Sequence, residues 1–131
     1  MRSGYEYQIR DDLTARGITF GYESEVLSYT STVRGGVCRD CGSKKIGKLR
    51  KYTPDFIIPR TQGKLYVEAK GRLTSTDRSK MRDVKREHPE LDIRFMFQNR
   101  SLKEAVAVST WCTKFNFLYA FGTEVPDSWI C

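Results

Sequence analysis

The sequence predicts one α/β domain, in the α+β sense of a mixed β-sheet flanked by helices. Three observations point to this class: a helical period in the first segment, apolar side chains at every second position in several later segments, and a basic helical stretch between two of those. With 131 residues, 39% of them apolar, the chain can close one core but is too short for two domains of about 100–150 residues. Residues 1–131 are therefore expected to form a single domain.

The first helix is expected over residues 4–16. Ser3 and Glu6 have the S-x-x-E spacing of a capping box, and Gly17 provides the stop. The apolar side chains between them recur at four-residue spacing: Tyr5, Ile9 and Leu13. Residues 18–26 then place apolar side chains at alternate positions and predict a strand.

The middle of the chain is expected to form two strands after an insertion. Residues 30–51 break the periodicity with glycines, a cysteine pair and basic residues, and predict a hairpin or knuckle without an apolar face that could join the core. Residues 52–59 read as an apolar strand bracketed by prolines. Residues 64–70 alternate between two faces, with Leu65, Val67 and Ala69 on one and Tyr66, Glu68 and Lys70 on the other.

The second half of the chain begins with a strongly basic helix. It is expected over residues 77–88, with N-cap candidates just before it, His88 as a C-cap and Pro89 as the stop. Three further elements are expected: a strand over 91–97, a short helix over 110–115 and a last strand over 117–121. Residues 101–108 have no decisive period.

The charge distribution suggests a polyanionic partner. The formal net charge is +7, and the excess begins at Arg34, because residues 1–30 carry three basic and five acidic side chains whereas residues 31–55 carry seven and two. A solvated hairpin kept soluble by its lysines is the alternative. No apolar run reaches the roughly 20 residues of a membrane span and no secretory leader is present, which predicts the cytosol and no membrane.

Three charged residues form the most informative pattern. Asp55 follows Pro54 at the start of one expected strand, and Glu68 and Lys70 share a face of the next, so their side chains should converge. Two adjacent carboxylates repel each other, and a hard divalent cation, Mg²⁺ above all, is the natural counter-charge. Lys70 could orient the metal-bound water or stabilise charge developing on a phosphate.

The alternative is a surface ladder of alternating charges, in which Glu68 pairs with Lys70 for well under ~1 kcal/mol. An E-x-K triplet alone occurs by chance in many proteins. The combination of Pro-Asp, an apolar strand, a turn and E-x-K on a second strand is much rarer, and it favours catalysis.

Six segments, spread over nearly the whole chain, resemble one known family. They are Arg2-Ser3-Gly4-Tyr5-Glu6, Tyr52-Thr53-Pro54-Asp55-Phe56, Val67-Glu68-Ala69-Lys70-Gly71, His88-Pro89-Glu90-Leu91-Asp92-Ile93-Arg94, Trp111-Cys112 and Pro126-Asp127-Ser128-Trp129-Ile130. The chain thus resembles the phage endonuclease I group of Holliday-junction resolvases, within the PD-(D/E)XK nucleases. The resemblance implies a PD-(D/E)XK nuclease core that carries the cysteine-containing insertion.

The resemblance implies a metal-dependent endodeoxyribonuclease that resolves four-way junctions and branched DNA in paired nicks. Asp55, Glu68 and the backbone carbonyl of Ala69 would hold Mg²⁺, for which Mn²⁺ is expected to substitute. Lys70 would act on the attacking water, and Glu6 would complete a second metal position. The resemblance also implies a homodimer with exchanged N-terminal segments, in which Glu6 serves the other chain's site, and a phage protein acting in the cytoplasm of the host cell.

Glu6 therefore has two roles open to it, a helix cap and a metal ligand, and both can coexist. The family's further acidic position after the first strand falls on Gly21 in this chain. That departure leaves Glu23 or Glu25 as substitutes.

Basic residues near the E-x-K strand are predicted to contact the DNA backbone rather than base edges. They are Arg72, Arg78, Lys80, Arg82, Lys85 and Arg86, together with Lys44 and Lys45 of the insertion. The alternative is a solvated helix face, because Asp83 and Glu87 offer local partners to Arg86 and its neighbours.

A C-x-x-C-G turn at Cys38 and Cys41 is typical of a structural zinc site. This pair supplies two of the four ligands, and the others could come from the same pair of a second protomer or from Cys112 and Cys131. Reduced thiols in a solvent loop and a redox pair are the alternatives, the latter disfavoured by the lack of a βαβ context.

Two further functions stay open at this point. One is a sequence-directed or mismatch-directed endonuclease of the same superfamily. The other is a non-catalytic zinc-knuckle module that binds DNA, in which Asp55 and Glu68 merely form surface ion pairs.

Overall fold

The computed structural model describes residues 4–37, 44–61, 63–98 and 101–130, and the side chains within these ranges except those of residues 32–48. The elements in chain order are α1 (Gly4–Ala15), β1 (Gly21–Tyr22), β2 (Leu27–Val37), β3 (Lys44–Tyr52), β4 (Phe56–Arg60), β5 (Gly63–Lys70), α2 (Ser75–Glu87), β6 (Asp92–Phe97), α3 (Leu102–Lys114), β7 (Leu118–Phe121) and α4 (Asp127–Ile130). None of the described helices is both long and apolar enough to cross a bilayer.

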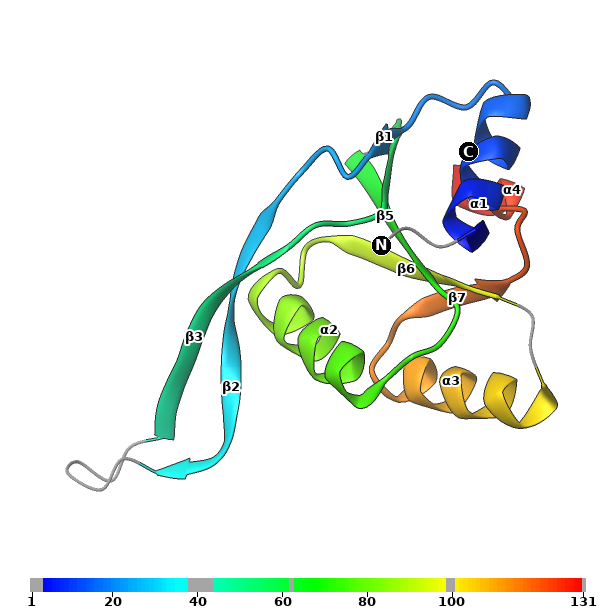
Figure 1. Cartoon of the computed structure of the whole chain (residues 1–131). Helices are drawn as coiled ribbons and strands as arrows, with labels where there is room; N and C mark the ends of the chain where they lie inside the picture. Colours follow the sequence, from blue (N-terminus) through cyan, green and yellow to red (C-terminus); the bar gives the residue numbers. More distant parts are fainter. Residues whose placement is uncertain (1–3, 38–43, 62, 99–100, 131) are drawn as a thin grey trace.

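A five-stranded mixed sheet forms the centre of the molecule, in the order β1-β4-β5-β6-β7 (Figure 1). The pairs β1–β4 and β4–β5 are antiparallel, whereas β5–β6 and β6–β7 are parallel. Parallel neighbours require a crossover, and α2 and α3 provide the two crossovers. The expected mixed sheet flanked by helices is therefore confirmed.

Each face of the sheet has its own hydrophobic core. Residues of α2 and α3, including Met81 and Trp111, pack on one face together with Tyr66 of β5. Ile9 and Leu13 of α1 pack on the other face with Val67 of β5 and with α4. The predicted alternation of side chains along β5 is thus confirmed, and it places the sheet between two helical layers.

Polar contacts also tie α1 to the segment that leads into α4. The Tyr5 hydroxyl donates to the Gly122 carbonyl at 2.6 Å, and Arg16 donates to the Val125 carbonyl at 2.7 Å and pairs with Asp127. Helix α1 is therefore fixed from both sides, by the sheet and by the chain around α4.

The predicted insertion is a β-hairpin, formed by β2 and β3, that extends away from the sheet (Figure 1). It is longer than the expected 30–51, because Leu27 already pairs with Tyr52. Tyr29 and Tyr52, which flank the predicted insertion, are buried in the same cluster as α2, and they fix the base of the hairpin to the core.

The strand expected over residues 18–26 is reduced to β1, which has two residues. Ile18, Phe20 and Tyr22 pack against the α1 face of the sheet, as their alternate spacing predicts. Val26, the last apolar residue of that pattern, is exposed. Glu23 adopts a left-handed φ of 50°, which an extended strand cannot accommodate.

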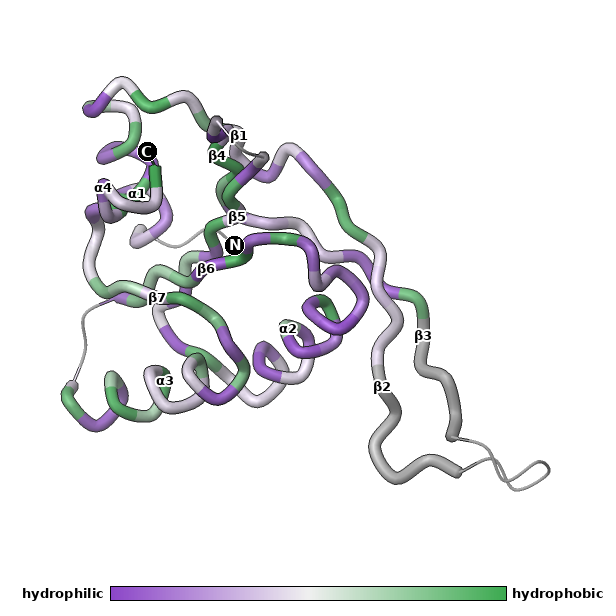
Figure 2. The backbone as a smooth tube through the Cα atoms, turned by 180° about the vertical axis from the view of Figure 1, so that it is seen from behind, coloured by the Kyte–Doolittle hydropathy of each residue, from purple (hydrophilic) through white to green (hydrophobic). Residues whose placement is uncertain are grey.

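The helices of the second half differ from the expected bounds. Helix α3 includes the short helix expected over 110–115 and most of residues 101–108, for which the sequence has no decisive period. Its first half leaves Leu102 and Val106 exposed, so only the second half carries the apolar pattern of a core helix. Helix α2 begins at Ser75, two residues before the expected 77–88, because Thr74 is its N-cap, and it ends at Glu87 with His88 as the expected C-cap. Figure 2 shows α2 as predominantly hydrophilic, in keeping with a helix that buries one narrow stripe.

Leu13 offers a test of the packing of α1. Leu13→Ala removes a fully buried side chain and leaves a cavity against the sheet, so we expect the free energy of unfolding in urea to fall by about 2–5 kcal/mol. The exposed Asp11 on the same helix is the control, because Asp11→Ala should change that free energy by less than about 0.5 kcal/mol. Equal values for both variants would mean that α1 does not pack on the sheet in solution.

Candidate metal and catalytic site

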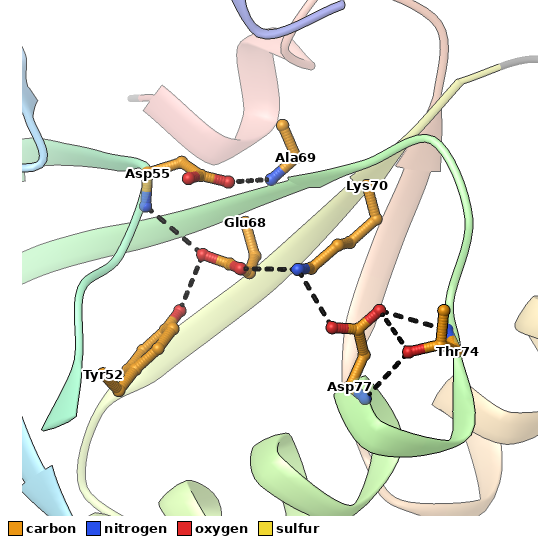
Figure 3. Close-up of polar contacts among 7 residues, drawn as sticks. All are labelled: Tyr52, Asp55, Glu68, Ala69, Lys70, Thr74 and Asp77. Atoms are coloured by element: carbon orange, nitrogen blue, oxygen red, sulfur yellow. Dashed lines mark hydrogen bonds and ion pairs between the residues drawn. The ribbon is translucent and has the colours of Figure 1, made fainter. Parts of the chain in front are cut away.

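Asp55 and Glu68 are brought together by the antiparallel pairing of β4 and β5. Asp55 directly precedes β4, and the Asp55 backbone N–H donates to Glu68 Oε1 at 3.3 Å. In return, the Ala69 backbone N–H donates to Asp55 Oδ2 at 2.9 Å (Figure 3). Both carboxylates are therefore positioned by main-chain donors of the neighbouring strand, which fixes them more firmly than side-chain contacts alone.

Glu68 is buried, with 4% of its surface exposed, and its two oxygens have different partners. Oε1 also accepts a hydrogen bond from the Tyr52 hydroxyl at 3.0 Å, whereas Oε2 lies 3.4 Å from Lys70 Nζ. The predicted convergence of Asp55, Glu68 and Lys70 is thus present. The alternative of a solvated surface ladder does not fit carboxylates that are both buried.

Lys70 is held between β5 and the start of α2. Its Nζ lies 3.3 Å from Asp77 Oδ1, and the other Asp77 oxygen accepts hydrogen bonds from the backbone N–H and hydroxyl of Thr74 (Figure 3). Asp77 therefore closes the capping box of α2 and also holds Lys70 in position. The T-x-x-D spacing in the sequence indicates a helix cap but carries no sign of the contact with Lys70.

Burial dominates the electrostatics of the two carboxylates. It raises the pKa of Asp55 from 3.8 to about 8, and the nearby charge of Glu68 adds to the rise, against the hydrogen bond from Ala69. Burial likewise raises the pKa of Glu68, although the positive charge of Lys70 opposes it. Without a cation, this pair of carboxylates therefore tends to hold a proton at neutral pH.

The surroundings of Lys70 favour its charged form, unlike those of the two carboxylates. Burial disfavours its charged form, but the carboxylates of Glu68 and Asp77 outweigh that effect and raise its pKa. Lys70 is accordingly an ammonium ion at neutral pH and acts as a donor and a positive charge rather than as a free base.

A cluster of three carboxylates lies beside this pair. Ligand oxygens of Glu6, Glu23 and Asp55 all lie within 4.8 Å of one another. Glu6 comes from α1, where the Tyr22 hydroxyl donates to its Oε2 at 2.7 Å. Glu23 follows β1, and its backbone N–H donates to the Asp55 carbonyl at 3.0 Å. Two glutamates beside one buried aspartate form an oxygen-rich site of the kind that suits Mg²⁺.

Comparisons with known proteins identify relatives of this chain. A model of the family described as phage endonuclease I matches residues 1–131. The chain is 31% identical over 123 residues to endodeoxyribonuclease 1 of Enterobacteria phage T3, covering 91% of this chain and 70% of that protein. It is 30% identical over 133 residues to endonuclease I of Escherichia phage T7, covering 98% of this chain and 77% of that protein.

The chain belongs to the phage endonuclease I family.

Of the two candidates for the further acidic position in this endonuclease I homologue, Glu23 is the one that lies beside Glu6 and Asp55. Glu25 is directed elsewhere, because it pairs with Lys64 at 2.9 Å and accepts from the Tyr66 hydroxyl at 3.3 Å. Sequence alone could not choose between them, since the choice depends on the left-handed turn at Glu23. The Ser3 partner in the capping box predicted for Glu6 lies outside the described residues.

The metal roles predicted for Glu68 and for the Ala69 carbonyl stay predictions. Glu68 is not a member of the three-carboxylate cluster of Glu6, Glu23 and Asp55, although its charge acts on Asp55. Its oxygens are shared among Tyr52, the Asp55 N–H and Lys70. Ala69 contacts Asp55 through its N–H, not through its carbonyl.

Three of the predicted DNA-contacting residues, Arg72, Arg78 and Lys80, lie between the end of β5 and the middle of α2. Arg72 is exposed, two residues after Lys70. Arg78 lines a recess between α2 and α3, where its buried Nε has no hydrogen-bond partner among the described residues. Lys80 Nζ lies 5.2 Å from the centre of the Tyr52 ring, close to Glu68.

The other three predicted contacts on α2 have structural partners. Arg82 lies 5.3 Å from the ring centre of Phe115, and Lys85 donates to the carbonyl oxygens of Phe115 and Asn116. Arg86 pairs with Asp83 at 2.9 Å. These contacts resemble the solvated helix face of the alternative interpretation, and DNA binding by these three residues stays a prediction.

The hairpin residues are described less fully. Lys44 and Lys45 lie in β3, but their side chains, like Cys38 and Cys41 of the zinc prediction, lie outside the described part of the structure. Cys131 lies outside it as well. Cys112, one of the possible further zinc ligands, is a free, buried thiol whose pKa is raised to about 12 by burial.

The raised pKa of Asp55 predicts how stability depends on pH. Between the unfolded value of 3.8 and the folded value of about 8, the folded state binds more protons than the unfolded state. In EDTA, the free energy of unfolding should therefore fall as pH rises from 5 to 8, by at most about 1.4 kcal/mol per pH unit for this group. Added Mg²⁺ should stabilise the protein more at pH 8 than at pH 5, because it competes with the proton.

Urea unfolding at several pH values checks this. Asp55→Asn should flatten the fall in EDTA and abolish the pH dependence of the Mg²⁺ effect. Asp11→Asn, at an exposed carboxylate of α1, should leave both unchanged. A wild-type profile that is flat from pH 5 to 8 would contradict the raised pKa.

Proposed function

We propose that this endonuclease I homologue is a Mg²⁺-dependent, structure-selective endodeoxyribonuclease that resolves four-way junctions and related branched DNA. The observation that carries the proposal is the placement of Lys70, as an ammonium ion, 3.4 Å from the buried Glu68, beside the cluster of Glu6, Glu23 and Asp55. Hydrolysis of a phosphodiester needs a held metal, a positioned water and a cation near the developing charge, and this site offers groups for each.

The donor set fits a hard divalent cation. Glu6, Glu23 and Asp55 would hold Mg²⁺, with Glu68 and the Ala69 carbonyl as the further ligands implied by the family resemblance. When bound, the ion would supply a Lewis acid for a phosphate oxygen and a water of lowered pKa. Mn²⁺ prefers the same oxygen ligands and is expected to substitute.

The side chains around the metal position have separate tasks. Lys70 donates a hydrogen bond to the attacking water or stabilises the negative charge that develops on the phosphate. Asp77 holds Lys70 at the edge of the site, and Tyr52 fixes the Glu68 carboxylate through its hydroxyl. The burial of the carboxylates excludes water that would otherwise screen these charges.

Selectivity for junctions and paired nicks rests on the family resemblance. Two matched nicks need two sites, and a two-fold homodimer would supply them. The T3 and T7 relatives are phage proteins, which supports the prediction that this chain is made and acts in the cytoplasm of a host cell. The basic surface of α2 supports an interaction with phosphates rather than with base edges.

Lys70 provides the direct test of catalysis. Lys70→Ala should lower the rate of junction cleavage in Mg²⁺ by at least about 10²-fold, because the charge that develops on the phosphate loses its cation. Binding of the same junction in EDTA, measured by gel shift, should be retained. Lys64→Ala is the matched control, since Lys64 lies on the same strand but is half-exposed and pairs with Glu25, so cleavage should be unchanged.

The substrate comparison separates the candidate functions. Wild-type protein should nick a four-way junction faster than nicked or linear duplex of the same sequence, and EDTA should stop all cleavage. Equal rates on the three substrates would instead favour a sequence- or mismatch-directed endonuclease. Metal-independent junction binding with no cleavage, unaffected by Lys70→Ala, would favour the non-catalytic module.

Exchange of N-terminal segments can be tested by complementation. One chain on its own already brings Glu6 to Asp55, and exchange would make the equivalent contact between two chains. We expect Glu6→Gln and Lys70→Ala proteins, each inactive alone, to regain junction nicking when unfolded and refolded together, because exchanged heterodimers contain one intact site. Mixing without unfolding is the control. Failure to regain nicking after refolding would mean that each chain uses its own Glu6.

A further inference from the structure

A groove runs between the β2–β3 hairpin and the first half of α2. It has a volume of about 740 Å³, and its lining includes Tyr29, Arg50 and Lys51 of the hairpin and Ser75, Thr76 and Lys80 of the helix. Figure 1 shows the hairpin passing beside α2 on the side away from α3. The groove is therefore separate from the recess between α2 and α3 and from the carboxylate cluster.

The hairpin is fixed against α2, so the groove is a built feature. Arg86 donates to the Thr30 carbonyl at 2.8 Å, and His88 Nε2 lies 2.7 Å from the Ser28 carbonyl. Tyr29 and Tyr52, one on each strand, are buried in the core cluster that contains α2. These contacts hold the base of the hairpin beside the C-terminal half of the helix, while the groove lies along its N-terminal half.

The chemistry of the lining suits phosphate groups. Arg50, Lys51 and Lys80 are positive, and Ser75 and Thr76 carry hydroxyl donors. The acidic residue in the lining, Asp83, is buried and pairs with Arg86, which offsets its charge. A narrow apolar ligand would find little to bind here, whereas a chain of phosphates would meet a cation or a hydroxyl along much of the path.

The groove reaches the catalytic residues through Lys80. Lys80 Nζ lies 5.2 Å from the centre of the Tyr52 ring, and the Tyr52 hydroxyl donates to Glu68 at 3.0 Å. The positive charge of Lys80 also opposes the rise in the pKa of Glu68, which places it within electrostatic reach of that carboxylate. A strand held in the groove would therefore continue toward Glu68 and Lys70.

We infer that the groove between the hairpin and α2 binds the sugar–phosphate backbone of the DNA arm next to the cleaved bond. This inference rests on the proposed nuclease function and gives the insertion a role in it: the hairpin forms one wall of the DNA path, and α2 forms the other. Recognition is of backbone charge and spacing, so it applies to arms of any sequence.

Binding of a four-way junction in EDTA, at a series of salt concentrations, tests the inference without depending on catalysis. Arg50→Ala/Lys51→Ala should weaken binding about tenfold or more at 0.1 M salt and make the slope of log K against log salt shallower by about 2. Lys103→Ala/Lys114→Ala removes the same charge from exposed positions on α3 and should leave the slope nearly unchanged. Equal losses in the two double variants would overturn the groove as a specific path and leave a general charge effect.

A second pair of variants compares an added negative charge with a neutral side chain of similar size at the same position, and neither variant removes a cation. Thr76 is exposed in the first turn of α2, where an acidic side chain is compatible with the helix dipole, so Thr76→Glu should fold normally. Thr76→Glu should weaken junction binding severalfold more than Thr76→Gln, and urea midpoints verify that both variants are folded. Equal binding by the two variants would overturn the inference.

The outcomes distinguish this inference from the proposed function. If wild-type protein cleaves junctions in Mg²⁺ but the groove variants bind with wild-type slopes, the nuclease assignment stands and the groove is not the DNA path. If wild-type protein neither binds nor cleaves junction DNA, the proposed function itself fails. An acidic peptide serves as a second probe. If the groove variants bind this peptide more weakly than wild-type protein does but bind junction DNA equally well, the groove belongs to a protein partner and the inference is overturned.

Discussion

The site depends on a reciprocal pair of hydrogen bonds between the start of β4 and the end of β5. The Asp55 N–H donates to the Glu68 carboxylate, and the Ala69 N–H donates to the Asp55 carboxylate. Because both donors belong to the main chain of adjacent strands, the register of the sheet sets the position of both acids. A slip of one residue would move every side chain of β5 to the opposite face and dismantle the site together with both cores.

The rest of the site is assembled from elements that have structural work of their own. Helix α1 brings Glu6, the turn after β1 brings Glu23, and the capping box of α2 brings Asp77 to Lys70. Each contribution comes from the end of an element or from a helix that packs on the sheet. Within this arrangement burial raises the pKa of Asp55, and a bound divalent cation would offset that cost of keeping Asp55 ionised.

Much of this arrangement follows from local sequence rules. The alternation in β5, the Pro-Asp start of β4 and the E-x-K spacing were sufficient to place Asp55, Glu68 and Lys70 at one point, because strand geometry leaves few alternatives. Glu23 and Asp77 could not be placed that way. Glu23 depends on a left-handed turn at a non-glycine residue, and Asp77 reaches Lys70 only after the loop between β5 and α2 has folded back.

The same limit applies to the fold. The sequence does not predict the continuous helix α3, because Leu102 and Val106 in its first half are exposed and blur the apolar period, and nothing in it indicates that Tyr29 packs with α2. Both features arise from tertiary packing. The spacing of apolar residues in the sequence does not predict such packing when the apolar stripe is short.

The contacts between α1 and the segment around α4 have a consequence for how distant parts of the chain influence chemistry. Arg16 and Tyr5 fasten α1 to residues 122–127, and α1 carries Glu6 into the acidic cluster. The position of Glu6 therefore depends on contacts with residues from the other end of the chain, and truncation of the segment around α4 would remove a support of the helix that carries Glu6.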